Sequence, residues 1–82
     1  MDKNINNNRL IKRLFKLAKE GNEEALEQLL ILFDPIIYKN SFIDNKFDED
    51  CYQELRIKLI DCIKNFKFNG IKSIYAYLDI EE

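Results

Sequence analysis

One apolar repeat, in residues 50–66 (DCYQELRIKLIDCIKNF), constrains the fold of this chain more than any other feature of the sequence. At about 100° per residue, its large apolar side chains fall on one narrow stripe of a helix. The stripe contains Tyr52, Leu55, Leu59, Ile63 and Phe66, with Cys62 at its edge. Such a stripe is typical of a helix that packs one face on a protein core. The repeat therefore predicts an amphipathic helix and assigns this stripe to the core.

The other side of the same helix carries a mixed set of side chains: Asp50, Gln53, Arg56, Ile57, Ile60 and Lys64. Two aliphatic residues inside a polar ring are typical of a small protein-binding patch, because the apolar centre gives affinity and the polar rim gives register. The alternative is that another part of the chain covers Ile57 and Ile60. The pattern alone leaves both interpretations open.

Composition favours helix for the rest of the chain. The 82 residues include only 2 Gly and 1 Pro, while Leu, Ile, Lys and Glu are abundant, a mixture that favours helices over turn-rich β structure. The chain is long enough for one modest core and too short for two. We expect an all-α fold in which an Asn-rich, disordered leader, residues 1–8, precedes a single domain, residues 9–82.

Capping residues predict the first helix boundaries. A helix from about Arg9 to Glu20 should end at Gly21, which suits the left-handed conformation that follows many helices. Asn22 can then cap a second helix, whose first turn is acidic as the helix dipole prefers.

The middle of the chain is less determined. Pro35 either begins a new helix capped by Asp34 or lies inside one long helix that continues through Phe42. Residues 43–48 (IDNKFD) read as a polar turn. The sequence FDED, residues 47–50, then supplies an N-cap and acids for the helix described above.

Charge is distributed unevenly along the chain. Residues 1–19 hold six Lys or Arg against one acid, a net +5, whereas residues 20–82 hold seven bases against fourteen acids, a net −7. In the first helix a basic stripe lies opposite the apolar face and contains Arg9, Lys12, Arg13, Lys16 and Lys19. Such a stripe is usually a solvated face, and the functional alternative is contact with phosphate, a membrane or an acidic partner.

Several function classes are excluded or disfavoured. The chain has no His, and no Ser or Cys is paired with a base at a recognisable spacing, so we expect no enzyme activity. Cys51 and Cys62 are spaced like neither a disulfide framework nor a zinc site, so we expect no metal and no cofactor. No apolar run approaches the roughly 20 residues of a membrane span, and the N-terminus lacks a secretory core, so we expect a cytoplasmic protein without a membrane partner.

The same helix also carries the motif of a known family. DCYQELRIKLIDCIKNF resembles region 2.2 of the sigma-70 family of bacterial transcription initiation factors, where D-L-x-Q-E precedes an apolar helix that ends in K-F. The matching positions are Asp50, Gln53, Glu54, Ile57, Leu59 and Phe66. Upstream, LAKEGNEEALEQLLILFDPIIYKNSF resembles the preceding segment of the family, and downstream FKFNGIKSIYAYL resembles the stretch that follows. The resemblance covers residues 9–80.

The resemblance implies a fold, a partner and a role. It implies a bundle of four to five helices built like sigma region 2, and transcription regulation without a cofactor. In that family the helix docks on the β′ clamp helices of core RNA polymerase, which implies a polymerase-binding set of Asp50, Gln53, Glu54, Arg56, Ile57 and Ile60. In style the chain is closest to the short sigma-like helix-turn-helix proteins of Firmicute conjugative transposons and to clostridial toxin-gene sigma factors.

The chain also departs from that family. After YAYL, where sigma factors place aromatic and basic residues, it has Asp79, Ile80 and two Glu. Because acids repel phosphates, we expect DNA binding by this chain alone to be weak. Tyr75 and Tyr77 either stack on exposed bases or pack in the core.

Two other functions therefore compete with polymerase binding. One is a DNA-binding helix-turn-helix regulator of a conjugative element that uses the basic stripe. The other is a self-associating helical scaffold that buries Ile57 and Ile60 across a twofold axis. The sequence does not fix the oligomeric state.

Overall fold

The computed structural model describes residues 8–81, so the expected leader lies outside the described residues except for Asn8. The elements in order are α1 (Asn8–Lys19), α2 (Glu23–Lys39), β1 (Phe42–Ile43), β2 (Lys46–Phe47), α3 (Glu49–Asn65) and α4 (Ile71–Leu78). Four helices and one two-stranded hairpin in residues 8–81 confirm the all-α class. Asn8, which the sequence assigned to the leader, is the first residue of α1.

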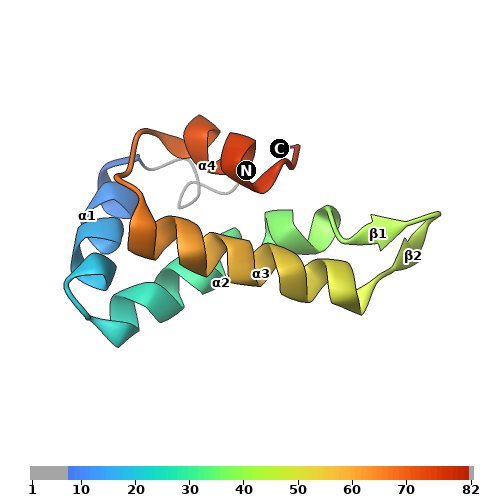
Figure 1. The fold of residues 1–82 in the computed structure, drawn as a ribbon, viewed down its shortest axis with the longest axis horizontal. Helices are drawn as coiled ribbons and strands as arrows, with labels where there is room; N and C mark the ends of the chain where they lie inside the picture. Colours follow the sequence, from blue (N-terminus) through green and yellow to red (C-terminus); the bar gives the residue numbers. More distant parts are fainter. Residues whose placement is uncertain (1–7, 82) are drawn as a thin grey trace.

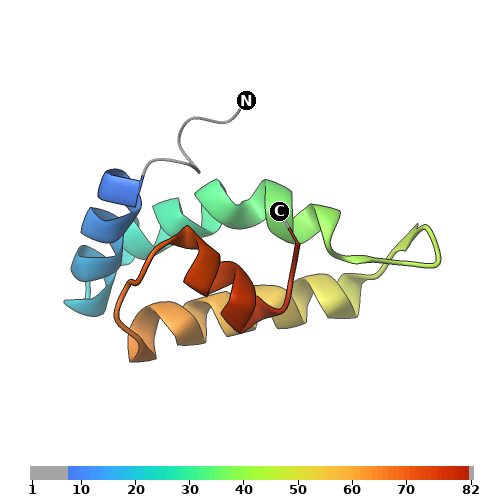
Figure 2. The same ribbon diagram turned by 90° about the horizontal axis from the view of Figure 1, so that it is seen from above.

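The two long helices, α2 and α3, run side by side in opposite directions and form the centre of the molecule (Figure 1). The α1 helix crosses them at one end, and the β-hairpin projects beyond them at the other. Figure 2 shows α4 lying over the α2–α3 pair on one side. Each helix contributes to a single core, because an amphipathic helix is stable only when its apolar stripe is covered. The core residues are Ile11, Leu14, Phe15, Ala25, Leu29, Phe33, Ile37, Leu55, Leu59, Cys62, Ile63, Ile74, Tyr75 and Leu78.

The turn between α1 and α2 follows the capping prediction. Gly21 has φ of +98°, and its N–H donates to the carbonyl of Ala18 at 3.1 Å, while the N–H of Asn22 donates to Leu17 at 3.0 Å. This pair of bonds is a Schellman motif, which satisfies carbonyls at the end of a helix. The Asn22 side chain then accepts from the N–H of Ala25 at 3.0 Å and caps α2. Gly21 as C-cap and Asn22 as N-cap are therefore confirmed.

The α2 helix passes through Pro35 and ends at Lys39. Of the two interpretations of Pro35, the long helix is the correct one, but its extension to Phe42 is wrong. The hydroxyl of Ser41, a buried residue, donates to the carbonyl of Ile37 at 2.6 Å, and the N–H of Asn40 closes the last turn. These bonds satisfy the final carbonyls, so the chain leaves the helix before Phe42.

The predicted polar turn over residues 43–48 is a β-hairpin instead. Phe42 pairs with Phe47 and Ile43 with Lys46, and the two connecting residues, Asp44 and Asn45, have φ of +52° and +66°. Two consecutive left-handed residues are the geometry of a type I′ turn, whose twist matches that of the strands. The strands have two residues each and carry no readable period-2 pattern, which explains why the sequence did not predict them.

The α3 helix begins as predicted, because the Asp48 side chain accepts from the N–H of Cys51 at 2.8 Å. Within the predicted apolar stripe, Leu55, Leu59 and Ile63 are buried and Tyr52 is half-buried. Phe66 is the exception. It follows the last helical residue with an extended backbone and is 47% exposed, so its assignment to the core face is wrong.

Candidate functional site

The side of α3 that faces away from the core, here the α3 outer face, carries Asp50, Gln53, Glu54, Ile57 and Ile60. Ile57 is 64% exposed, so no described part of the chain covers it. Ile60 is half-buried, and the three polar residues are exposed. Of the two interpretations of this side of the helix, coverage by the same chain is therefore wrong for Ile57 and holds only in part for Ile60.

Arg56 lies at the edge of the α3 outer face and turns toward α2. Its Nη1 is 3.5 Å from Oδ1 of Asp34, and its guanidinium lies 5.6 Å from the centre of the Tyr52 ring. The Tyr52 hydroxyl donates to the same carboxylate. This hydrogen bond, with burial and the Asp34 charge, raises the pKa of Tyr52, and Arg56 opposes the rise. These contacts fix the orientation of Arg56 at the boundary between the two helices.

A shallow cavity lies between α2 and α3 beside Arg56. Its lining residues are Glu27, Leu30, Ile31, Asp34, Pro35 and Arg56. Ile31 is 63% exposed, as much as Ile57, and the sequence analysis did not single it out. A helical wheel of α2 would have found it, because Ile31 falls on the opposite side from Leu29 and Phe33.

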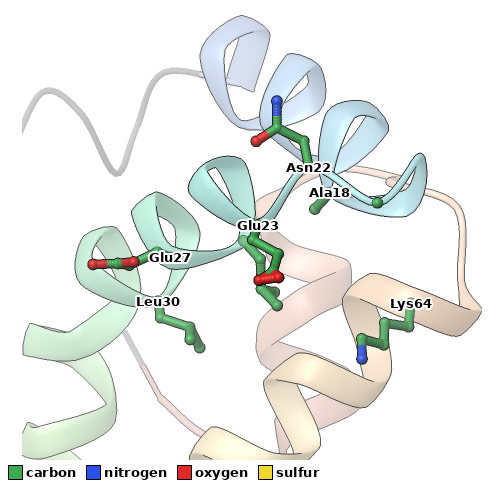
Figure 3. A pocket seen from close by; sticks show the side chains of 8 residues that line it. Ala18, Asn22, Glu23, Glu27, Leu30 and Lys64 are labelled. Carbon is green, nitrogen blue, oxygen red and sulfur yellow. The ribbon is translucent and has the colours of Figure 1, made fainter.

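A second cavity continues this depression toward the α1–α2 turn (Figure 3). Its lining residues are Ala18, Gly21, Asn22, Glu23, Leu26, Glu27, Leu30 and Lys64. Figure 3 shows Lys64 on the α3 side and Glu23 and Leu30 on the α2 side. The two cavities share Glu27 and Leu30, so they lie next to each other along the α2–α3 boundary, and together we call them the α2–α3 groove.

The basic stripe lies on the exposed side of α1. All five of its residues, Arg9, Lys12, Arg13, Lys16 and Lys19, are exposed. Tyr75 and Tyr77 take different positions. The Tyr75 ring is buried 6.4 Å from that of Phe33, whereas Tyr77 is 38% exposed and its hydroxyl donates to Asp61 at 2.6 Å. Of the two tyrosines, only Tyr77 has an accessible ring.

The cysteines are both free thiols, with Cys51 half-buried and Cys62 buried. Burial raises the pKa of the Cys62 thiol, Asp61 adds to the rise and Lys19 opposes it. Within residues 8–81 no group of three or more His, Cys, Asp or Glu side chains could hold a metal ion. No helix in that range is long and apolar enough to cross a membrane.

Comparison with known protein families gives one match. The model of a helix-turn-helix domain family matches residues 12–67, which is more than half of the chain. The chain belongs to this helix-turn-helix domain family. Searches of curated proteins and of solved structures found no match. The match extends from α1 through α3 and ends before α4.

Membership of the helix-turn-helix family supports a DNA-binding regulator. In the structure, α1 and α2 are joined by a three-residue turn that contains Gly21, as is common in such motifs. In helix-turn-helix proteins the N-terminal residues of the second helix usually contact base edges. Here α2 begins with Glu23, Glu24 and Glu27, all exposed, and carboxylates repel the phosphates that flank a DNA groove. The exposed side of α1, in contrast, carries the basic stripe.

Proposed function

We propose that this helix-turn-helix protein regulates transcription by docking on core RNA polymerase through the α3 outer face. The observation that carries the proposal is the 64% exposure of Ile57 at the centre of a polar ring. The likeness of residues 50–66 to sigma region 2.2 supplies the partner, the β′ clamp helices. The contact set comprises Asp50, Gln53, Glu54, Arg56, Ile57 and Ile60.

The arrangement of these residues suits a helix-on-helix contact. An exposed Ile gains from burial against an apolar partner at about 25 cal/mol per Å², and the polar ring then sets the register. Asp50 and Glu54 are exposed acids one turn apart on the same side of α3. They favour a basic partner, because complementary charge accelerates association and suppresses wrong partners.

The α2–α3 groove extends this surface beyond α3. Arg56 lines the groove together with Ile31, so a docked helix that covers Ile57 can also reach a second exposed Ile on α2. Ile57 and Ile31, with Arg56 held between the two helices, would fix the direction in which a partner helix lies on this surface. Ile31 is therefore added to the proposed contact set.

The test is binding of the purified chain to core RNA polymerase and to an isolated β′ clamp-helix fragment. We expect Ile57→Asp to weaken binding by about 2 kcal/mol or more, roughly 30-fold, because it places a charge at the centre of the interface. Ile43→Asp is the matched control, since Ile43 is 53% exposed in the hairpin and lies outside the contact set. Equal binding by wild type and Ile57→Asp would overturn the proposal.

Charge reversal provides a second, independent arm. Replacing both Asp50 and Glu54 with Lys should slow association and reverse the contribution of these two positions to its salt dependence, while circular dichroism should remain that of the wild type. Self-association is the competing explanation of the exposed Ile57. Sedimentation at micromolar concentration separates the two, because a dimer that dissociates in Ile57→Asp would assign this face to a second copy of the chain.

A second candidate function is DNA binding through the basic stripe of α1. Family membership favours it, and the five exposed bases of the stripe supply the charge. DNA affinity should then fall steeply with salt, and replacing Lys12 and Arg13 should reduce the salt dependence. Affinity that does not respond to salt would exclude this function.

A further inference from the structure

The acidic start of α2 raises the question of where a helix-turn-helix domain of this composition would contact DNA. A surface for DNA must present positive charge to the phosphates. Among the described cavities, one is lined by four Lys and no acid: Lys12, Lys16 and Lys19 of α1, Lys67 of the α3–α4 connection, and the rings of Phe15 and Phe68. We refer to it as the lysine cleft.

Tertiary packing creates the lysine cleft. The α3–α4 connection passes beside α1 (Figure 1), and the Phe68 ring packs on the Phe15 ring with 5.3 Å between their centres. Phe15 is buried and Phe68 is half-buried, so this pair anchors the connection to α1. Lys67, the residue before Phe68, is thereby held next to the basic stripe. The result is a cavity of about 450 Å³ with an aromatic floor and a basic rim.

The four ammonium groups are available for a ligand. Within residues 8–81 the recorded ion pair is Arg56–Asp34, and no carboxylate lies within ion-pair distance of the four Lys. All four side chains are exposed. Four like charges around one depression repel one another, and an anion in the cleft relieves that repulsion. Arg9 and Arg13, the other members of the basic stripe, do not line the cleft.

We propose that the lysine cleft binds the phosphate backbone of DNA and does so without reading its sequence. A Lys side chain is a compact charge that suits a phosphate, and the lining Lys lie on α1 and the α3–α4 connection, away from the start of the second helix that usually contacts base edges. The cleft also contains no Asn or Gln of the kind that pairs with adenine. Contacts of this chemistry position a protein on DNA and carry no sequence information. The proposal deepens the DNA-binding role favoured by family membership and is independent of polymerase docking.

The test measures binding of short DNA duplexes of two unrelated sequences by fluorescence anisotropy across a salt series. Four phosphate contacts predict that log affinity falls with log salt with a slope of roughly −3.6, a loss of about 150-fold between about 50 and 200 mM. Lys67→Gln should reduce the slope by about 0.9 with both duplexes. Lys46→Gln removes one exposed Lys of the hairpin, outside both the cleft and the basic stripe, and its slope should stay within error of wild type.

Three results would overturn the proposal: an unchanged slope in Lys67→Gln, equal effects of Lys67→Gln and Lys46→Gln, or a change confined to one of the two sequences. Displacement of DNA by inorganic phosphate beyond the effect of chloride at equal ionic strength would assign the cleft to a small anion. Lys67→Gln should retain polymerase binding, and Ile57→Asp should retain the salt slope. Failure of the cleft and failure of the docking face are therefore distinguishable.

Discussion

At one end of the α2–α3 pair, α1 packs on the pair, and Phe15 of α1 and Leu29 of α2 are almost fully buried. At the other end the hairpin leaves Phe42 and Phe47 more than two-fifths exposed. Both ends are rich in large apolar side chains. The covered end removes them from water by stacking one helix on another. At the hairpin end the aromatic rings contact mainly one another, with Tyr38 and Phe47 stacked 5.1 Å apart.

This difference indicates that the covered α1 end determines the fold, whereas the hairpin is an addition to it. Burial of apolar area is the dominant favourable term in folding, so the covered end should carry most of the stability. Rings that stay half in water gain only part of that term. The hairpin should therefore tolerate substitutions that the covered end does not.

The largest effect is expected for Phe33→Ala at the covered core. Phe33 is fully buried, and its ring meets that of Tyr75 edge to face at 6.4 Å. Loss of its side chain should lower the free energy of unfolding by about 3–5 kcal/mol, because it leaves a cavity between α2 and α4. Urea denaturation followed by circular dichroism measures the change. A loss below about 1 kcal/mol would show that the core readily closes around the missing ring.

A smaller effect is expected at the turn that joins α1 to α2. Gly21→Ala places a Cβ on a residue with φ of +98°, although no other atom lies within 4 Å of that position. The cost is therefore one of backbone conformation, about 1–2 kcal/mol. The matched comparison at the hairpin is Asn45→Gly, which should leave stability unchanged or raise it, because glycine adopts the left-handed conformation more easily than Asn. A lower urea midpoint in Asn45→Gly than in Gly21→Ala would contradict this explanation.

The same contrast explains which features the sequence predicted. The α3 apolar stripe, Asn22 and Asp48 as caps and Gly21 at the end of α1 are local, because each depends on residues within about one turn. The structure confirms the caps and the stripe apart from Phe66. Phe66 was misassigned since the helical period continues to it, while the helix itself ends at Asn65. The hairpin was missed because two-residue strands carry no periodicity.

The candidate surfaces divide in the same way. A helical wheel gave the α3 outer face except Glu54, which came from the family resemblance, but whether Ile57 was covered depended on the packing of the other helices. Lys67 joins Lys12 and Lys16 only because Phe68 packs on Phe15 across more than fifty residues of sequence. A local pattern does not say on which side of a bundle a connection will run. The lysine cleft was therefore not predictable from the sequence.

Phe47→Ala tests the hairpin end directly. It removes the ring that stacks on Tyr38 and also contacts Phe42 and Tyr52 at 5.8 and 5.6 Å between ring centres. Because Phe47 stays 42% exposed, we expect a loss of only about 0.5–1.5 kcal/mol, the range of an aromatic pair. Hydrogen exchange should become faster in residues 42–47 and stay unchanged in α1. Loss of protection throughout the chain would mean that the hairpin belongs to the cooperative core.

The smallest expected effect concerns Tyr52, beside the hairpin, and its contribution to the stability of the fold at alkaline pH. The hydrogen bond to Asp34, burial and the charge of that carboxylate raise the pKa of Tyr52 above its ordinary value of about 10. A raised pKa in the folded state means that folding favours the protonated phenol. Its stabilising contribution is therefore fully present below about pH 10 and is lost as pH rises through the higher folded-state pKa.

In an absorbance titration of the phenolates, Asp34→Asn should move the ionisation of one tyrosine to lower pH. Asp44→Asn removes an equal charge at the hairpin turn, where the side chain has no recorded bond to a tyrosine among residues 8–81, and should leave the titration unchanged. If both variants titrate alike, general electrostatics and not the Asp34 hydrogen bond sets the pKa of Tyr52.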